Sequence, residues 1–116
     1  MTPFGARLRA LRQARGVTLG AMAEAMQLSS AYLSALENGH RGRPSAGLIH
    51  QVCEFFGLIW DEADELSRLA QLSHPRVVID TAGLAPEATE LANRLALRIG
   101  ELPPERLSAM LGLLRG

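Results

Sequence analysis

The sequence predicts an all-α protein, with a five-helix domain over residues 1–71 and a C-terminal extension over residues 72–116. Three observations support this fold class. Apolar residues recur three and four positions apart along most of the 116 residues, as they do on one face of a helix. Ser, Thr or Pro stands before most of these stretches, and Gly often follows them, as at helix ends. Only residues 76–80, RVVID, favour a strand.

The first helix is predicted to begin at Thr2-Pro3 and to end at Gly16. Thr can accept a hydrogen bond from a first-turn N–H group, and Pro at the first helical position has no N–H group to leave unpaired. The apolar face of this helix is formed by Phe4, Leu8 and Leu11. The opposite face carries three arginines that we expect in solvent and in salt bridges, namely Arg7, Arg9 and Arg15.

Two short helices are predicted next, and each has its own N-terminal cap. Thr18 starts the second helix, which must end near Gln27 because Ser29 can cap a third one. Asn38-Gly39 ends the third helix with residues that tolerate the left-handed conformation. The buried faces are expected to hold Met22, Ala23, Met26, Leu33 and Leu36. Two helices joined by about four residues form a helix-turn-helix.

The rest of the chain holds four more predicted helices. They cover residues 45–57, 61–70, 86–100 and 103–114, and the last two are amphipathic. Residues 76–80 have no strand partner in the chain, so they either pair with a second subunit or form an extended linker. Trp60 is either at the edge of the core or in a dimer contact. Because exposed apolar faces are costly in a monomer, the extension predicts self-association.

Composition excludes several classes of protein. The net charge is zero, but residues 1–60 hold six Arg and three acids, whereas residues 61–116 hold six Arg and nine acids. Cys53 is the only cysteine, so a disulfide or a cysteine-based metal site is not expected, and we expect a packed thiol there. The sequence has no catalytic set, no metal-ligand spacing and no phosphate-binding loop. We therefore expect that the protein is not an enzyme and that it binds no cofactor. The chain lacks a signal-peptide pattern and a membrane-spanning run, which predicts a cytoplasmic, nucleoid-associated protein.

A group of residues in register over positions 18–44 carries a family resemblance. They are Thr18, Met22-Ala23, Ser29, Leu33, Leu36, Glu37-Asn38-Gly39 and Arg43-Pro44. On these residues the chain resembles the phage-repressor/Cro-type helix-turn-helix family (the XRE family) of bacterial regulators. The resemblance covers roughly residues 4–70. It implies a transcriptional regulator, most often a repressor, that binds a palindromic DNA operator as a homodimer.

The resemblance also implies roles for individual residues. The third helix would enter the major groove, with residues 30, 31 and 34 or 35 toward the bases. Relatives usually carry Gln, Asn or Arg at such positions, and often Gln at position 19, so readout by groove shape is expected to contribute here. The expected DNA-binding set is Thr18, Leu19, Ser29, Ser30, Ala31, Tyr32, Ser34, Ala35, Arg41 and Arg43. Arg12 and Glu37 match a structural salt bridge of the family.

Dimerisation is assigned to the extension, and two other functions stay open. The expected contact residues are Val77, Val78, Ile79, Leu91, Leu95, Leu107 and Leu111. One alternative is an antitoxin that regulates its own operon while its C-terminal segment neutralises a toxin. The other is a protein-interaction module on the same fold, since the small side chains at positions 30, 31 and 35 would read few bases.

Overall fold

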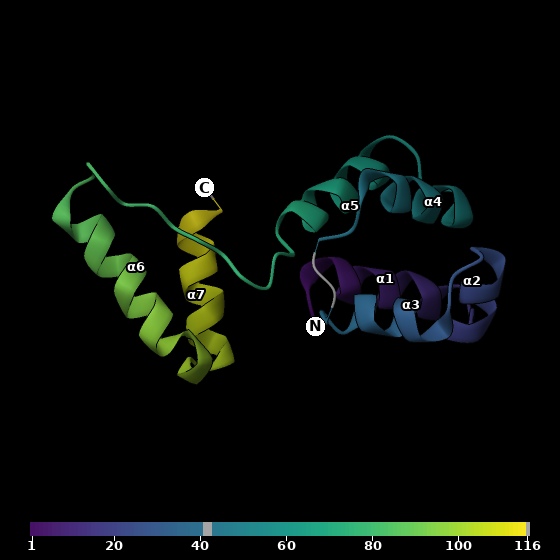
Figure 1. The fold of residues 1–116 in the computed structure, drawn as a ribbon, viewed down its shortest axis with the longest axis horizontal. Helices are drawn as coiled ribbons and strands as arrows, with labels where there is room; N and C mark the ends of the chain where they lie inside the picture. Colours follow the sequence, from purple (N-terminus) through teal and green to yellow (C-terminus); the bar gives the residue numbers. More distant parts are fainter. Residues whose placement is uncertain (41–42, 116) are drawn as a thin grey trace. The chain divides into compact units, whose positions relative to one another are not determined.

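The computed structural model describes residues 1–40 and 43–115. Within them the regular elements are seven α-helices and one 3₁₀ turn, without a strand, which confirms the all-α prediction (Figure 1). The chain divides into two compact units, Met1–Val77 and Val78–Gly116.

The first unit holds five α-helices: α1 (Pro3–Ala14), α2 (Leu19–Ala25), α3 (Ser30–Glu37), α4 (Ala46–Phe56) and α5 (Asp61–Gln71). Four of them start at a hydroxyl side chain that accepts a hydrogen bond from a first-turn N–H group. These caps are Thr2, Thr18, Ser29 and Ser45. The cap positions read from the sequence are therefore confirmed.

The first four helices also end in the same way. The third residue after α1, α2 and α3, and the second after α4, donates its N–H to the carbonyl five residues back, and the residue before it donates to the carbonyl three residues back. This Schellman arrangement needs a left-handed residue at its centre. Gly16, Gly39 and Gly57 supply it after α1, α3 and α4, whereas Gln27 adopts a φ of 58° after α2.

One hydrophobic core lies between these five helices. Among the described residues, all sixteen buried apolar side chains fall between Phe4 and Ala70, and Figure 1 shows α1 beside α3. At that contact Gly5 lies against α3 so closely that a Cβ atom there would meet the carbonyl oxygen of Glu37. Ser73 extends the unit beyond α5, because its hydroxyl accepts the Phe4 N–H (2.9 Å) and donates to the Leu69 carbonyl (2.6 Å).

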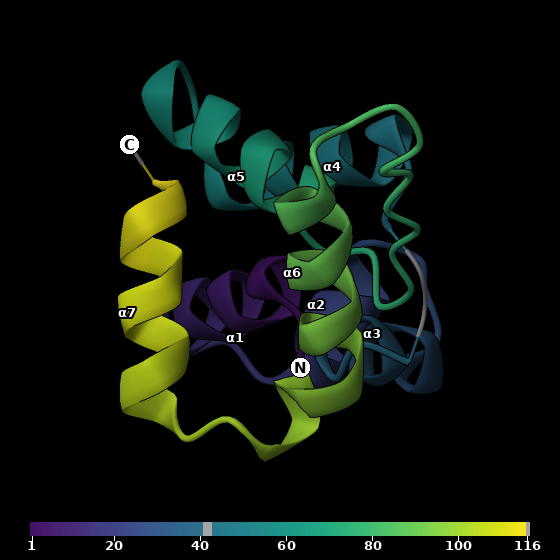
Figure 2. The same cartoon turned by 90° about the vertical axis from the view of Figure 1, so that its left-hand side faces the viewer.

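The second unit is a helical hairpin. The chain runs along α6 (Pro86–Arg98), turns through a 3₁₀ segment, η1 (Ile99–Glu101), and returns along α7 (Pro104–Leu114) (Figure 2). None of the residues in these three elements is buried. The unit therefore has exposed apolar side chains on both helices and no core of its own.

Two expectations from the sequence need correction. Residues 76–80 form no strand, so the predicted extended or β segment is not supported. The physical reason is that a strand is held by hydrogen bonds to a neighbouring strand, and the described chain offers none to this exposed segment. Trp60 is 81% exposed, so it does not lie at the edge of the core.

Candidate nucleic-acid interface

Helices α2 and α3 and the turn between them form the helix-turn-helix that the sequence predicted. The turn covers residues 26–29, with the left-handed Gln27 at the end of α2 and the Ser29 cap at the start of α3. Met22, Met26, Leu33 and Leu36 point into the core and hold the two helices to the rest of the unit. The N-terminal turn of α3 stays exposed, which is the end that reads bases in helix-turn-helix proteins.

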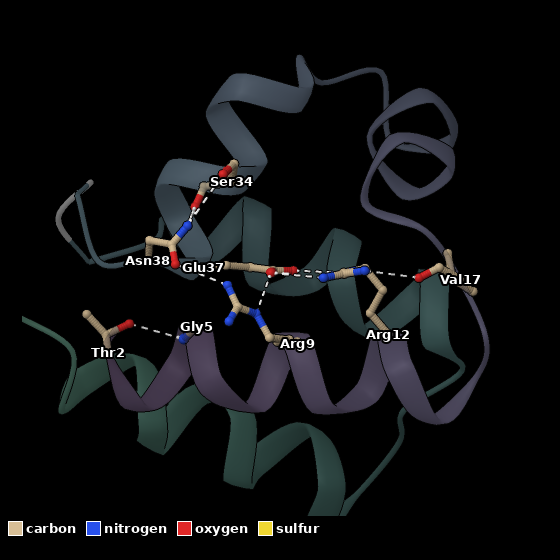
Figure 3. A network of polar contacts seen from close by, with 8 residues as sticks. All are labelled: Thr2, Gly5, Arg9, Arg12, Val17, Ser34, Glu37 and Asn38. Carbon is tan, nitrogen blue, oxygen red and sulfur yellow. Dashed lines mark hydrogen bonds and ion pairs between the residues drawn. The ribbon is translucent and has the colours of Figure 1, made fainter.

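A buried carboxylate fixes the other end of α3 to α1 (Figure 3). Glu37 is 1% exposed, and both of its oxygens accept hydrogen bonds from Arg12, at 3.0 and 3.2 Å. Arg12 also donates to the carbonyl of Val17 (3.2 Å), directly before the Thr18 cap of α2. The ion pair expected between Arg12 and Glu37 is therefore present, and it joins α1 to both helices of the motif.

Arg9 and Asn38 extend this network. A salt bridge of Arg9 was expected, but neither its partner nor the contact with Asn38 was predicted. Arg9 donates to Glu37 (3.2 Å) and to the side-chain oxygen of Asn38 (3.0 Å). The Asn38 side-chain amide donates in turn to the Ser34 carbonyl (2.9 Å). Spacing could have suggested Arg9, because residues three apart on a helix share a face and Arg12 was already paired with Glu37.

The predicted base-reading residues differ in exposure. Ser30 and Ala31 are exposed, whereas Ser34 and Ala35 are half-buried. The Ser34 hydroxyl lies 3.4 Å from the side-chain amide of Asn38, so it already has a polar partner within the protein. The geometry thus leaves Ser30 and Ala31 as the most accessible pair for contact with bases.

The residues predicted to lie beside the DNA backbone have varied surroundings. Thr18 and Ser29 are exposed, and their hydroxyl oxygens serve as helix caps, so each O–H group can still donate to a phosphate. Leu19 and Tyr32 are half-buried and pack against the core. Arg43 is exposed, and Arg41 lies outside the described residues.

Two further side chains outside the expected DNA-binding set have clear structural roles. Arg15 donates to the Phe56 carbonyl (2.8 Å) and lies 5.6 Å from the centre of the Phe56 ring, which ties α1 to α4. Cys53 is buried on α4, and burial raises the pKa of its thiol. A raised pKa lowers the fraction of reactive thiolate, so this cysteine is a packing residue.

The described helices include none that is long and apolar enough to span a membrane. Among the described residues, no group of three or more His, Cys, Asp or Glu side chains could hold a metal ion.

Comparison with known proteins agrees with this geometry. Residues 3–74 match the model of a helix-turn-helix domain family, so the chain belongs to that family. It is 44% identical over 52 residues to the uncharacterized HTH-type transcriptional regulator RghRB of Bacillus subtilis, covering 45% of this chain and 37% of that protein. The chain is also 41% identical over 54 residues to the HTH-type transcriptional repressor RghR of the same organism, and this match covers 47% of this chain and 40% of that protein.

A shorter match links the chain to a larger regulator. It is 57% identical over 37 residues to the HTH-type transcriptional regulator PrpR of Mycobacterium tuberculosis, covering 32% of this chain and 8% of that protein. The chain thus spans less than half the length of each of these three relatives. No solved structure matches the chain significantly.

Proposed function

We propose that the protein is a DNA-binding transcriptional regulator, acting as a repressor, in which α3 enters the major groove of an operator. The observation that carries this proposal is the exposed N-terminal turn of α3, whose other end is joined to α1 by the buried Glu37 network. The named relatives are transcriptional regulators, and one of them is a repressor, which supports the same function.

The contacts would divide between bases and phosphates. Ser30 and Ala31 can reach base edges, with Ser34 and Ala35 further along the helix. Ser can bond to several bases and Ala can contact a thymine methyl group, so direct readout is modest. Hydroxyls of Thr18, Ser29 and Tyr32 and the guanidinium groups of Arg41 and Arg43 would contact the backbone, which adds selection by groove width.

The test is enrichment of binding sequences from a random DNA library with the full-length protein, followed by affinity measurement for the selected site. We expect one enriched sequence and binding that weakens steeply with salt, since phosphate contacts release counterions. Enrichment of no sequence would contradict sequence-specific recognition and would favour the interaction-module alternative.

A charge placed on the N-terminal turn of α3 tests the orientation. Ala31→Glu should reduce affinity for the selected site at least about tenfold, because a carboxylate would face the phosphates and bases. The matched control is Ser67→Glu on the exposed surface of α5, which makes the same change in charge and should bind normally. Equal loss in both variants would show that net charge, not α3, determines binding.

We further propose that the regulator is a homodimer on a palindromic site, with its two α3 helices about 34 Å apart. The surface proposed for the contact comprises Val77, Val78, Ile79, Leu91, Leu95, Leu107 and Leu111. All are exposed except Leu95, which is half-buried, and apolar surface of this extent favours association.

Paired substitutions on α7 test the dimer. Leu107→Asp with Leu111→Asp should shift sedimentation of the full chain from dimer to monomer. Leu113→Asp is the control, because it removes a more exposed leucine of the same helix that lies outside the proposed surface. A dimer that survives the double substitution would refute the proposed contact.

A further inference from the structure

A groove in the second unit combines apolar side chains with arginines. Four apolar residues from α6, α7 and the connection between them line it, namely Leu91, Leu95, Leu102 and Met110. Three arginines line it as well, namely Arg94, Arg98 and Arg106. Among the described lining residues there is no acid, so the groove is both apolar and positively charged.

The positive charge is only weakly neutralised within the unit. Arg94 contacts Glu90 at 2.7 Å and Arg98 contacts Glu101 at 3.9 Å, and all four side chains are largely exposed. Exposed pairs of this kind contribute little and exchange readily with other partners. Arg106 has no ion pair within the described part of the chain. The three guanidinium groups are therefore available to carboxylates from another molecule.

The size of the groove favours a protein segment over a small molecule. Its volume is about 220 Å³. Pockets for small ligands hold about 300–1,000 Å³ and enclose most of the ligand. A shallow apolar groove along two helices is instead the geometry that accepts the apolar face of an amphipathic helix.

The groove as a whole fits poorly against the same groove of a second copy, although its Leu91 and Leu95 also belong to the proposed dimer surface. If two grooves faced each other across a two-fold axis, the arginines of one copy would approach those of the other. Like charges across an interface disfavour binding, whereas arginine and carboxylate groups form paired hydrogen bonds. We propose that the groove binds an acidic amphipathic helix of a different protein, with its apolar face on the four apolar residues and its carboxylates on the three arginines.

An acidic helix could bind the groove whether or not the protein binds DNA, but its binding would affect the proposed dimer. Leu91 and Leu95 belong to both the groove and the proposed dimer surface. A bound acidic helix would therefore compete with the second copy for these leucines, and a protein partner could release the regulator from a palindromic operator.

The test uses two synthetic helical peptides of about 14 residues, long enough to follow α6. Both carry leucines at positions i, i+3, i+4 and i+7, and they differ only in flanking Glu or Lys residues. Fluorescence anisotropy with the full chain should show that the Glu peptide binds at least about tenfold more tightly. This preference should shrink as salt rises from about 50 to about 500 mM.

Charge reversal inside and outside the groove completes the test. Arg98→Glu with Arg106→Glu should weaken binding of the Glu peptide at least about tenfold. The matched control, Arg76→Glu with Arg115→Glu, changes the net charge equally at exposed arginines that do not line the groove. Circular dichroism checks that both variants stay helical.

Four results would overturn the proposal. The first is equal affinity for the two peptides, and the second is that neither peptide binds. The third is that the control variant loses as much affinity for the Glu peptide as the groove variant does. The fourth is that no peptide binds while the groove substitutions change self-association, because the second copy would then be the occupant.

Discussion

Gln27 occupies a backbone conformation that glycine occupies at the three equivalent helix ends. Its φ of 58° places an ordinary side chain in the left-handed region after α2. Replacing it with Gly should stabilise the protein by about 0.5–1 kcal/mol, because the Cβ strain disappears and outweighs the entropy cost of glycine. Urea unfolding followed by circular dichroism measures the change.

Gln51 provides the control for that prediction. It is exposed within α4, where Gly should instead cost about 0.5–1 kcal/mol. If Gln27→Gly destabilised the protein as much as Gln51→Gly does, the result would contradict a left-handed backbone conformation at Gln27.

Gly5 is required by the close approach of α1 and α3. A Cβ atom there would collide with the Glu37 carbonyl oxygen and lie within 3 Å of two more backbone atoms. Backbone cannot move aside cheaply, so Gly5→Ala should destabilise the fold by about 1–3 kcal/mol.

Gly47 is the matched control for this position. It lies on the exposed surface of α4, where the nearest other atom to an added Cβ is the Ser45 hydroxyl oxygen at 4.0 Å. Gly47→Ala should be neutral or stabilising, since Ala favours helices. Similar thermal unfolding of the two variants would contradict the close contact at Gly5.

These residues mark the limit of what the sequence could predict. The caps Thr2, Thr18 and Ser29 were readable because capping depends on neighbouring residues alone. The left-handed Gln27 was not, since glutamine carries no turn signal. Gly5 was not either, because its requirement comes from a helix thirty residues away. Local chemistry was therefore predictable, and close tertiary contacts were not.

At the scale of elements, α1 holds the recognition motif through arginines of unequal importance. Arg12 is 15% exposed and makes two bonds to Glu37, whereas Arg9 is 36% exposed and makes one. Arg12→Met should cost about 3 kcal/mol, because it leaves a buried carboxylate poorly compensated. Arg9→Met keeps the bidentate pair and should cost about 1 kcal/mol or less.

Denaturant unfolding of the two variants gives the comparison, and each serves as the control for the other. Methionine keeps the long apolar stem of arginine in both variants. The difference between their losses of unfolding free energy therefore reports the ion pairs rather than packing. Equal costs would mean that Glu37 depends on both arginines alike. A smaller cost for Arg12→Met than for Arg9→Met would contradict the geometry of the network.

The buried side chains of a helix were predictable from the sequence where its apolar face packs against other helices of the same unit. The faces of α1 to α3 pack into one core, so spacing alone identified Phe4, Leu8, Leu33 and Leu36. Residues 76–80 failed as a strand because β propensity describes packing in a sheet, and the described chain offers none. The apolar faces of α6 and α7 were also readable from spacing, but no residue of these two helices is buried, so these faces have no core to fill within their unit.

At the scale of the whole molecule, the buried residues of the described chain all lie in the first unit. Every buried residue of the described chain lies between Phe4 and Ser73, so a protein ending at Val77 should fold as stably as the full chain. A protein ending at Ala70 should be less stable by about 1–3 kcal/mol, because it loses the Ser73 hydroxyl that accepts the Phe4 N–H. The two lengths differ by only seven residues, which makes them a matched pair for thermal unfolding.

The same pair separates folding from association and DNA binding. If the dimer forms through residues 77–111, the 1–77 protein should sediment as a monomer at concentrations where the full chain is a dimer. It should then bind a half-site as the full chain does, but a palindrome much more weakly, because only a dimer places two α3 helices on one operator. A 1–77 protein that remains dimeric would move the contact into the first unit, where the exposed Ile59 and Trp60 would be the next residues to substitute.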